Sequence, residues 1–233
     1  MDGNPSPTTK GWNKALVAVG SAIGSGVLID AVLLRPLYLR WGATGKELKK
    51  SWPGDELVQR PGQCTRGITI HAPAERIWPW IMQIGQDRGG FCSYTWLENL
   101  FLANIRNADS IIPGLRPRGV GDVVWMAPKH RYGGRACMAV AQLLPGTAMV
   151  LVQRNEFEPA ILGERVHGGI WQFFVEPIDD NNARLIMRGA APDETSLLYD
   201  FVFDPAHFIM ERKMMCGIKE RAERDERLAQ RLG

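Results

Sequence analysis

The chain has 233 residues, of which 45% are hydrophobic and 23% are charged, and its formal net charge at pH 7 is +3. This composition is typical of a globular protein and excludes an intrinsically disordered chain. Its four cysteines are far apart in the sequence, which gives little support to a zinc ribbon or a disulfide framework.

The positive charge is concentrated near the N-terminus. Residues 1–50 contain seven Lys and Arg against three Asp and Glu, whereas residues 51–233 contain 21 basic and 22 acidic residues. The larger part has no basic stripe interleaved with aromatic residues, the pattern typical of nucleic-acid-binding proteins. We therefore expect no nucleic-acid partner, and no motif in the chain indicates a cofactor.

An apolar stretch covers residues 15–34, after a tail at residues 1–14, and Asp30 is its only charged residue. A helix of this length spans about 30 Å, the thickness of the hydrocarbon core of a bilayer. More basic residues follow the stretch than precede it, which favours a cytoplasmic C-terminal domain. The stretch thus predicts a single-pass membrane anchor. The basic residues expected to contact lipid headgroups with it are Arg35, Arg40, Lys46, Lys49 and Lys50.

Residues 15–34 have two other interpretations. A signal peptide would need small residues at a cleavage site after the stretch, and these are missing. A helix packed on the domain stays open as the alternative, because Asp30 is costly inside a bilayer. Gly20 and Gly24 form a GxxxG pattern, which indicates a weak homodimer.

A polar, turn-rich segment at residues 35–63 is expected to be a basic juxtamembrane region and linker. The domain follows at residues 64–228, with a short tail at 229–233. Its apolar patterns predict helices that begin at Pro73, Tyr94 and Asp204, the last continuing to Leu228. Alternating patterns predict strands at residues 65–71, 122–126, 135–144, 148–154, 169–177 and 183–189. One sheet with a single long terminal helix is an α+β arrangement.

Several local strings carry a family resemblance. They are Trp41–Thr44, Pro53–Leu57, Ile77–Trp80, Gln83–Phe91, Ser93–Tyr94, Trp96–Asn99 and His207–Lys213. With this layout, the chain resembles the SRPBCC superfamily of START and polyketide cyclase/dehydrase-like proteins, and most closely its membrane-anchored bacterial members. Cys92 stands where an aromatic residue is expected. The resemblance implies a helix-grip fold, in which a curved antiparallel sheet wraps around the C-terminal helix, here preceded by the N-terminal hydrophobic helix.

The resemblance also implies a ligand cavity between the sheet and the terminal helix. Methionine and aromatic side chains adapt well to large apolar ligands. The residues predicted to line the cavity are Trp80, Trp96, Trp125, Arg135, Trp171, Phe173, Met210 and Met214. The alternative is that these side chains simply fill a core.

Four residues are candidates for acid–base chemistry in this cavity. His207 and Glu211 are four residues apart and share one helix face. Glu98 lies among apolar residues that would desolvate it and raise its pKa, and Tyr94 is close to it in the sequence. The alternatives are a surface pair for His207 and Glu211 and a solvent-exposed position for Glu98. Two ligands are too few for a metal site.

Three functions are compatible with these patterns. The favoured one is a membrane-tethered module that binds a lipid-like or polyketide-like small molecule. The second is a cyclase or dehydratase that uses the acid–base residues, and whether the protein is an enzyme stays open. The third is a partner-binding scaffold, for which the charged residues 219–231 are the only indication.

Overall fold

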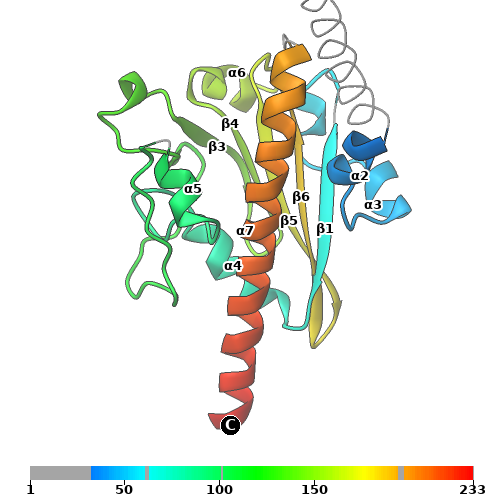
Figure 1. The fold of residues 1–233 in the computed structure, drawn as a ribbon. Coiled ribbons are helices and arrows are strands. Elements are labelled where there is room, and N and C mark those ends of the chain that lie inside the picture. Colours follow the sequence, from blue (N-terminus) through cyan, green and yellow to red (C-terminus); the bar gives the residue numbers. More distant parts are fainter. Residues whose placement is uncertain (1–32, 61–62, 101, 194–196, 233) are drawn as a thin grey trace, which may run out of the picture.

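The computed structural model describes residues 33–60, 63–100, 102–193 and 197–232. A six-stranded antiparallel sheet has the strand order β1-β6-β5-β4-β3-β2. Its strands are β1 (Cys64–Ile70), β2 (Val123–Trp125), β3 (Cys137–Leu144), β4 (Ala148–Gln153), β5 (Ile170–Asp179) and β6 (Asn182–Ala190). The long helix α7 (Leu197–Leu232) crosses one face of this sheet (Figure 1). The predicted α+β helix-grip architecture is confirmed.

Eight shorter helical elements of the described residues surround the sheet. They are α2 (Arg35–Leu39), α3 (Gly45–Lys49), α4 (Ala74–Met82), α5 (Thr95–Leu100), α6 (Phe157–Ile161) and the 3₁₀ turns η2 (Asp55–Leu57), η3 (Tyr132–Gly134) and η4 (Arg154–Glu156). Helices α4 and α5 lie beside α7, whereas α2 and α3 lie next to β1 (Figure 1).

The main core lies between the sheet and the pair α4 and α7. Phe173 and Met187 of the sheet, Trp80 of α4, and Met215 and Ile218 of α7 are each completely buried there. The apolar stripe of α7 covers residues 214–222, which is why this half of the helix is fixed on the sheet. The charged residues that follow continue beyond it.

The opposite face of the sheet is covered by residues 44–58. Helix α3 begins with a capping box of Thr44 and Glu47, and Trp52 packs on Phe174 of β5 with their ring centroids 4.4 Å apart. Glu47 also accepts a hydrogen bond of 2.8 Å from Arg184 of β6. The sequence suggests that these residues are a linker, but they pack on the sheet. The reason is that their carboxylates pair with arginine side chains of β6 on this face.

The predicted membrane localisation requires a correction. Within the described residues, no helix combines the length and the apolar character needed to cross a bilayer, and this finding overturns the prediction. The apolar stretch at residues 15–34 and the GxxxG pattern in it lie outside the described residues, apart from Leu33 and Leu34.

Candidate functional site

A buried polar cluster joins the sheet to α7. The carboxylate of Glu211 is only 3% exposed and forms an ion pair with Arg66 of β1, itself 1% exposed. The indole nitrogen of Trp171 on β5 donates a hydrogen bond of 2.6 Å to the same carboxylate. Arg66 also donates from Nε to the Tyr38 carbonyl at 2.8 Å. Three elements thus converge on one carboxylate inside the protein.

His207 lies one helical turn before Glu211, as the sequence predicts. Its ring centroid is 6.4 Å from that of Trp171. Both residues of the predicted acid–base pair therefore lie beside this indole. Burial, and then the charge of Arg66, lower the pKa of His207 to about 4. The imidazole is therefore neutral at pH 7.

Arg66 lies outside the set of predicted site residues. The strand pattern nevertheless indicates that it is buried. It lies two residues before Ile68 and four before Ile70, so the alternation of β1 places it on the core face. A cation at such a position needs a buried anion. Burial also lowers the pKa of Arg66. The sequence alone does not say that Glu211 is the anion.

Glu98 is the second buried carboxyl group. It lies on α5 and is 4% exposed, and neither of its carboxyl oxygens has a hydrogen-bond partner among the described residues. Desolvation raises its pKa to about 7. Burial raises the pKa of the Cys92 thiol, and the carboxyl group of Glu98 contributes to this increase. The desolvation predicted for Glu98 is thus present.

The orientation of α5 is unusual. Trp96 and Leu100 are 68% and 67% exposed, so the helix turns these apolar side chains to solvent and its acid inward. The side chain of Asn99 fixes the C-terminal end of α5, because it accepts from the Ile105 amide at 2.6 Å and donates to the Ile105 carbonyl at 3.1 Å. These contacts hold Glu98 on the inner side.

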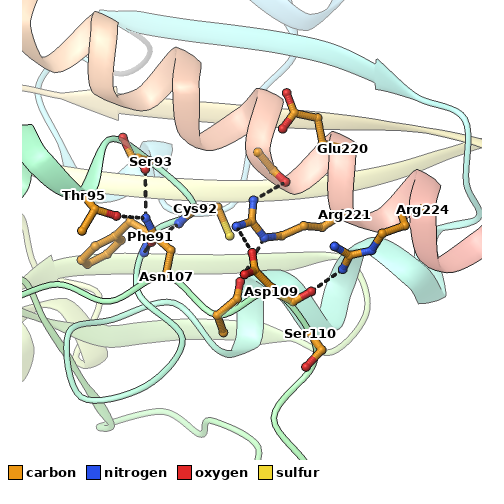
Figure 2. Close-up of polar contacts among 12 residues, drawn as sticks. Phe91, Cys92, Ser93, Thr95, Asn107, Asp109, Ser110, Glu220, Arg221 and Arg224 are labelled. Carbon is orange, nitrogen blue, oxygen red and sulfur yellow. Dashed lines mark hydrogen bonds and ion pairs between the residues drawn. The ribbon is translucent and has the colours of Figure 1, made fainter.

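Asn107 fixes the segment that leads into α5 (Figure 2). Its Oδ1 accepts hydrogen bonds from the amides of Phe91 and Cys92, at 2.9 and 2.8 Å. Its Nδ2 donates to the Ser93 carbonyl and to Thr95 Oγ1, both at 2.9 Å. Cys92 has φ of +55°, a conformation that costs energy for a residue with a side chain. One amide therefore holds the turn before α5 in a strained conformation.

The same segment is fastened to α7. Ser93 Oγ donates to the Met210 carbonyl at 2.9 Å. Gly217 lies so close to the Cys92 carbonyl that a Cβ at position 217 would be 2.2 Å from its oxygen. Farther along α7, Arg221 donates to the Ala108 carbonyl at 3.0 Å and to Asp109 at 2.9 Å (Figure 2). Glu98 is thus carried on a segment that α7 positions at several points.

The other predicted site residues lie in different environments. Phe173 and Met214 are buried in the main core, and the ring of Trp171 packs at a tilt against Phe173 with a centroid distance of 4.6 Å. Trp80 is also buried there. Trp125, Met210 and Tyr94 are partly buried, whereas Trp96 and Arg135 are exposed. The structure brings Trp171, Phe173 and Met214 together and leaves Trp96 and Arg135 outside this group.

Two hollows on the described part of the chain lie away from the interface between the sheet and α7. The larger has a volume of about 460 Å³ and the smaller about 310 Å³. Both lie where β4 ends, and the larger also borders the start of β3. The described residues include no group of three or more His, Cys, Asp or Glu side chains arranged to hold a metal ion.

Comparison with known proteins gives weak structural similarities. No family model and no curated protein sequence matches the chain. A protein from Nitrosospira multiformis is 12% identical, with a TM-score of 0.39 over 67% of this chain and 92% of that one. A conserved protein from Geobacillus kaustophilus is 10% identical, with a TM-score of 0.38 over 68% and 93%. CalC from Micromonospora echinospora, a self-sacrificing resistance protein, is 8% identical, with a TM-score of 0.38 over 69% and 91%. Membership of the SRPBCC superfamily stays a prediction.

Proposed function

We propose that the protein binds a small, largely apolar molecule on the α5 side of the interface between the sheet and α7, with Glu98 as its polar anchor. The observation that carries this proposal is the carboxyl group of Glu98, which is buried with both oxygens unpartnered among the described residues. A ligand hydroxyl or amine would supply the missing hydrogen bonds.

The energetic argument rests on the cost of this burial. A buried polar group without a partner destabilises a protein by about 1–3 kcal/mol, and a charged one by more. Such groups are retained where function needs them, and functional sites are where local rules are broken. The residues of the main core that are nearest to Glu98 in the sequence are the apolar Phe91, Cys92, Ala103 and Ile105. They would contact the apolar body of the ligand.

The first test is to purify the full chain gently and to analyse an organic extract by mass spectrometry, beside the variants Glu98→Leu and Glu75→Leu. Glu75 is an exposed acid of α4 and serves as the matched control. We expect a stoichiometric apolar molecule with the wild type and with Glu75→Leu, and loss of it with Glu98→Leu.

Stability distinguishes loss of a site from loss of folding. Because Glu98→Leu removes an unpartnered buried acid, we expect its melting temperature to equal or exceed that of the wild type. If the extract is empty for the wild type and no ligand is retained from a panel of fatty acids and aromatic polyketides, the proposal fails.

An enzyme of the cyclase or dehydratase type is the second candidate. The observation that favours it is the pKa of Glu98, about 7, since a carboxyl group that titrates near neutral pH serves both as an acid and as a base. The molecule identified by mass spectrometry would be incubated with wild type and with Glu98→Gln. Conversion by the wild type and its loss in Glu98→Gln, with binding retained, would support the enzyme; unchanged molecules in both would exclude it.

A further inference from the structure

A hollow with two arginines lies at the open end of the β3–β4 hairpin. It has a volume of about 460 Å³ and is lined by Gly134, Arg135, Gln153, Arg154 and Asn155. No carboxylate is among these residues. We refer to it as the arginine hollow.

The hairpin register brings the two sides of the arginine hollow together. Met138 near the start of β3 pairs with Gln153 at the end of β4, so the residues just before β3 and just after β4 face each other. Gly133 and Gly134 have φ of +62° and +72°, and they turn the chain from η3 into β3 at Arg135. Arg154 is close enough to Cys137 to influence the pKa of its thiol. Residues 19 positions apart thus form one surface.

The guanidinium groups of Arg135 and Arg154 make no hydrogen bond or ion pair with any residue that the structure describes. Other arginines of the chain are satisfied: Arg184 pairs with Glu47, and Arg188 pairs with Asp55. Both guanidinium groups of the hollow are exposed. Each therefore keeps its forked set of donors for a ligand, and a planar fork suits the oxygens of a phosphate.

A second hollow continues from the first. It has a volume of about 310 Å³ and shares Arg154 and Asn155, and it adds Gly121, Phe157, Glu158 and Pro159. The ring of Phe157 lies over Gly121, where a Cβ would be 3.4 Å from the ring. One end of the combined surface thus offers cations, and the other offers an aromatic ring and the carboxylate of Glu158.

We propose that the arginine hollow binds the phosphate group of a small, soluble phosphate monoester that also carries hydroxyl groups. Two guanidinium groups match the charge of a dianion, and the amides of Gln153 and Asn155 provide further donors. The hollow is much larger than a water molecule, whose share of liquid volume is about 30 Å³, so there is room for an organic remainder. Glu158 repels a second anion and accepts hydrogen bonds from hydroxyl groups.

The test uses isothermal titration calorimetry of the full chain with glycerol 3-phosphate, with inorganic phosphate and with glycerol, all at one ionic strength. The variants are Arg135→Gln and Arg154→Gln. Arg131→Gln is the matched control, because Arg131 is an exposed residue of the same loop and does not line either hollow. We expect glycerol 3-phosphate to bind more tightly than inorganic phosphate, and glycerol not to bind.

Loss of one charge-assisted hydrogen-bonding group should weaken binding of glycerol 3-phosphate at least about tenfold in Arg135→Gln and in Arg154→Gln. Arg131→Gln should bind as the wild type does. Equal weakening in all three variants would show attraction by general charge and would overturn the site, as would the absence of binding to the wild type. Because all three positions are exposed, unchanged melting temperatures are expected and are checked.

Vesicles of phosphatidylcholine with phosphatidic acid distinguish a lipid headgroup from a soluble ester. The proposal would be overturned in favour of a lipid ligand by three results together. The wild type would sediment with these vesicles, Arg154→Gln would not, and glycerol 3-phosphate would not bind. Binding of glycerol 3-phosphate without sedimentation supports it.

Discussion

At the scale of single residues, burial determines how Glu98 titrates. Its pKa in the folded protein is about 7, against 4.5 for an exposed glutamate. Between these two pH values the folded state binds a proton that the unfolded chain has released. The contribution of Glu98 to the free energy of unfolding therefore decreases as the pH rises from about 4.5 to about 7, and it stays low above that.

The pH dependence of stability tests this argument. A shift of this size corresponds to about 3 kcal/mol, and Glu98→Gln removes the titrating proton. We expect the wild type to lose about 3 kcal/mol more than Glu98→Gln between pH 4.5 and pH 8, as measured by urea denaturation. His207 and the other titrating groups are common to both proteins and cancel in the comparison. Equal changes in the two proteins would contradict the burial of an unpartnered carboxyl group.

At the scale of elements, helix α5 shows how a short helix is oriented by its surroundings. The apolar residues Trp96 and Leu100 predict a buried side for this helix, yet both are exposed, and Glu98 is inside. A helix of six residues has fewer than two turns, so its own apolar stripe is small. The hydrogen bonds of Asn99 and Asn107 at its two ends fix its rotation instead.

The ion pair between β1 and α7 allows a prediction about how these elements are joined. Removing one partner of a buried pair leaves an uncompensated charge, which costs about 3–5 kcal/mol, whereas replacing both partners by apolar residues is often nearly neutral. We expect Glu211→Leu to lose this amount of stability. The double variant Arg66→Met with Glu211→Leu should recover most of it.

Urea denaturation of the wild type, both single variants and the double variant measures this coupling. Additive losses would show that Arg66 and Glu211 do not depend on each other. Lys213→Leu is the control, because Lys213 on the same helix lies 3.8 Å from Glu220 in a half-exposed pair, and such surface pairs contribute about 0–1 kcal/mol.

At the scale of the whole molecule, both faces of the sheet are covered by segments far apart in the sequence. Helices α4 and α7 cover one face, and residues 44–58 cover the other. Leu57 packs with Val150 and Val152, and Trp52 packs with Phe174. The buried carboxylate of Asp55 accepts hydrogen bonds from Arg188 at 2.9 and 3.0 Å.

Truncation tests whether residues 44–58 belong to the folding unit. A chain of residues 64–233 would expose the apolar residues beneath this segment and leave Arg188 without its anion, so we expect it to aggregate. A chain of residues 33–233 should give a monomeric, cooperatively unfolding protein. Size-exclusion chromatography and near-ultraviolet circular dichroism measure both. A native-like monomer of residues 64–233 would show that the segment is dispensable.

The sequence by itself determined the positions of the strands along the chain, the long terminal helix and the α+β fold, because apolar periodicity is a local property that each element carries within it. It also indicated that Glu98 lies among apolar residues. Only the tertiary structure decided that Glu211 pairs with Arg66, that α5 turns Glu98 inward, and that Arg135 and Arg154 share one hollow. These features depend on contacts between residues distant in the chain, and such contacts exist only once the sheet has paired and α7 has packed on it.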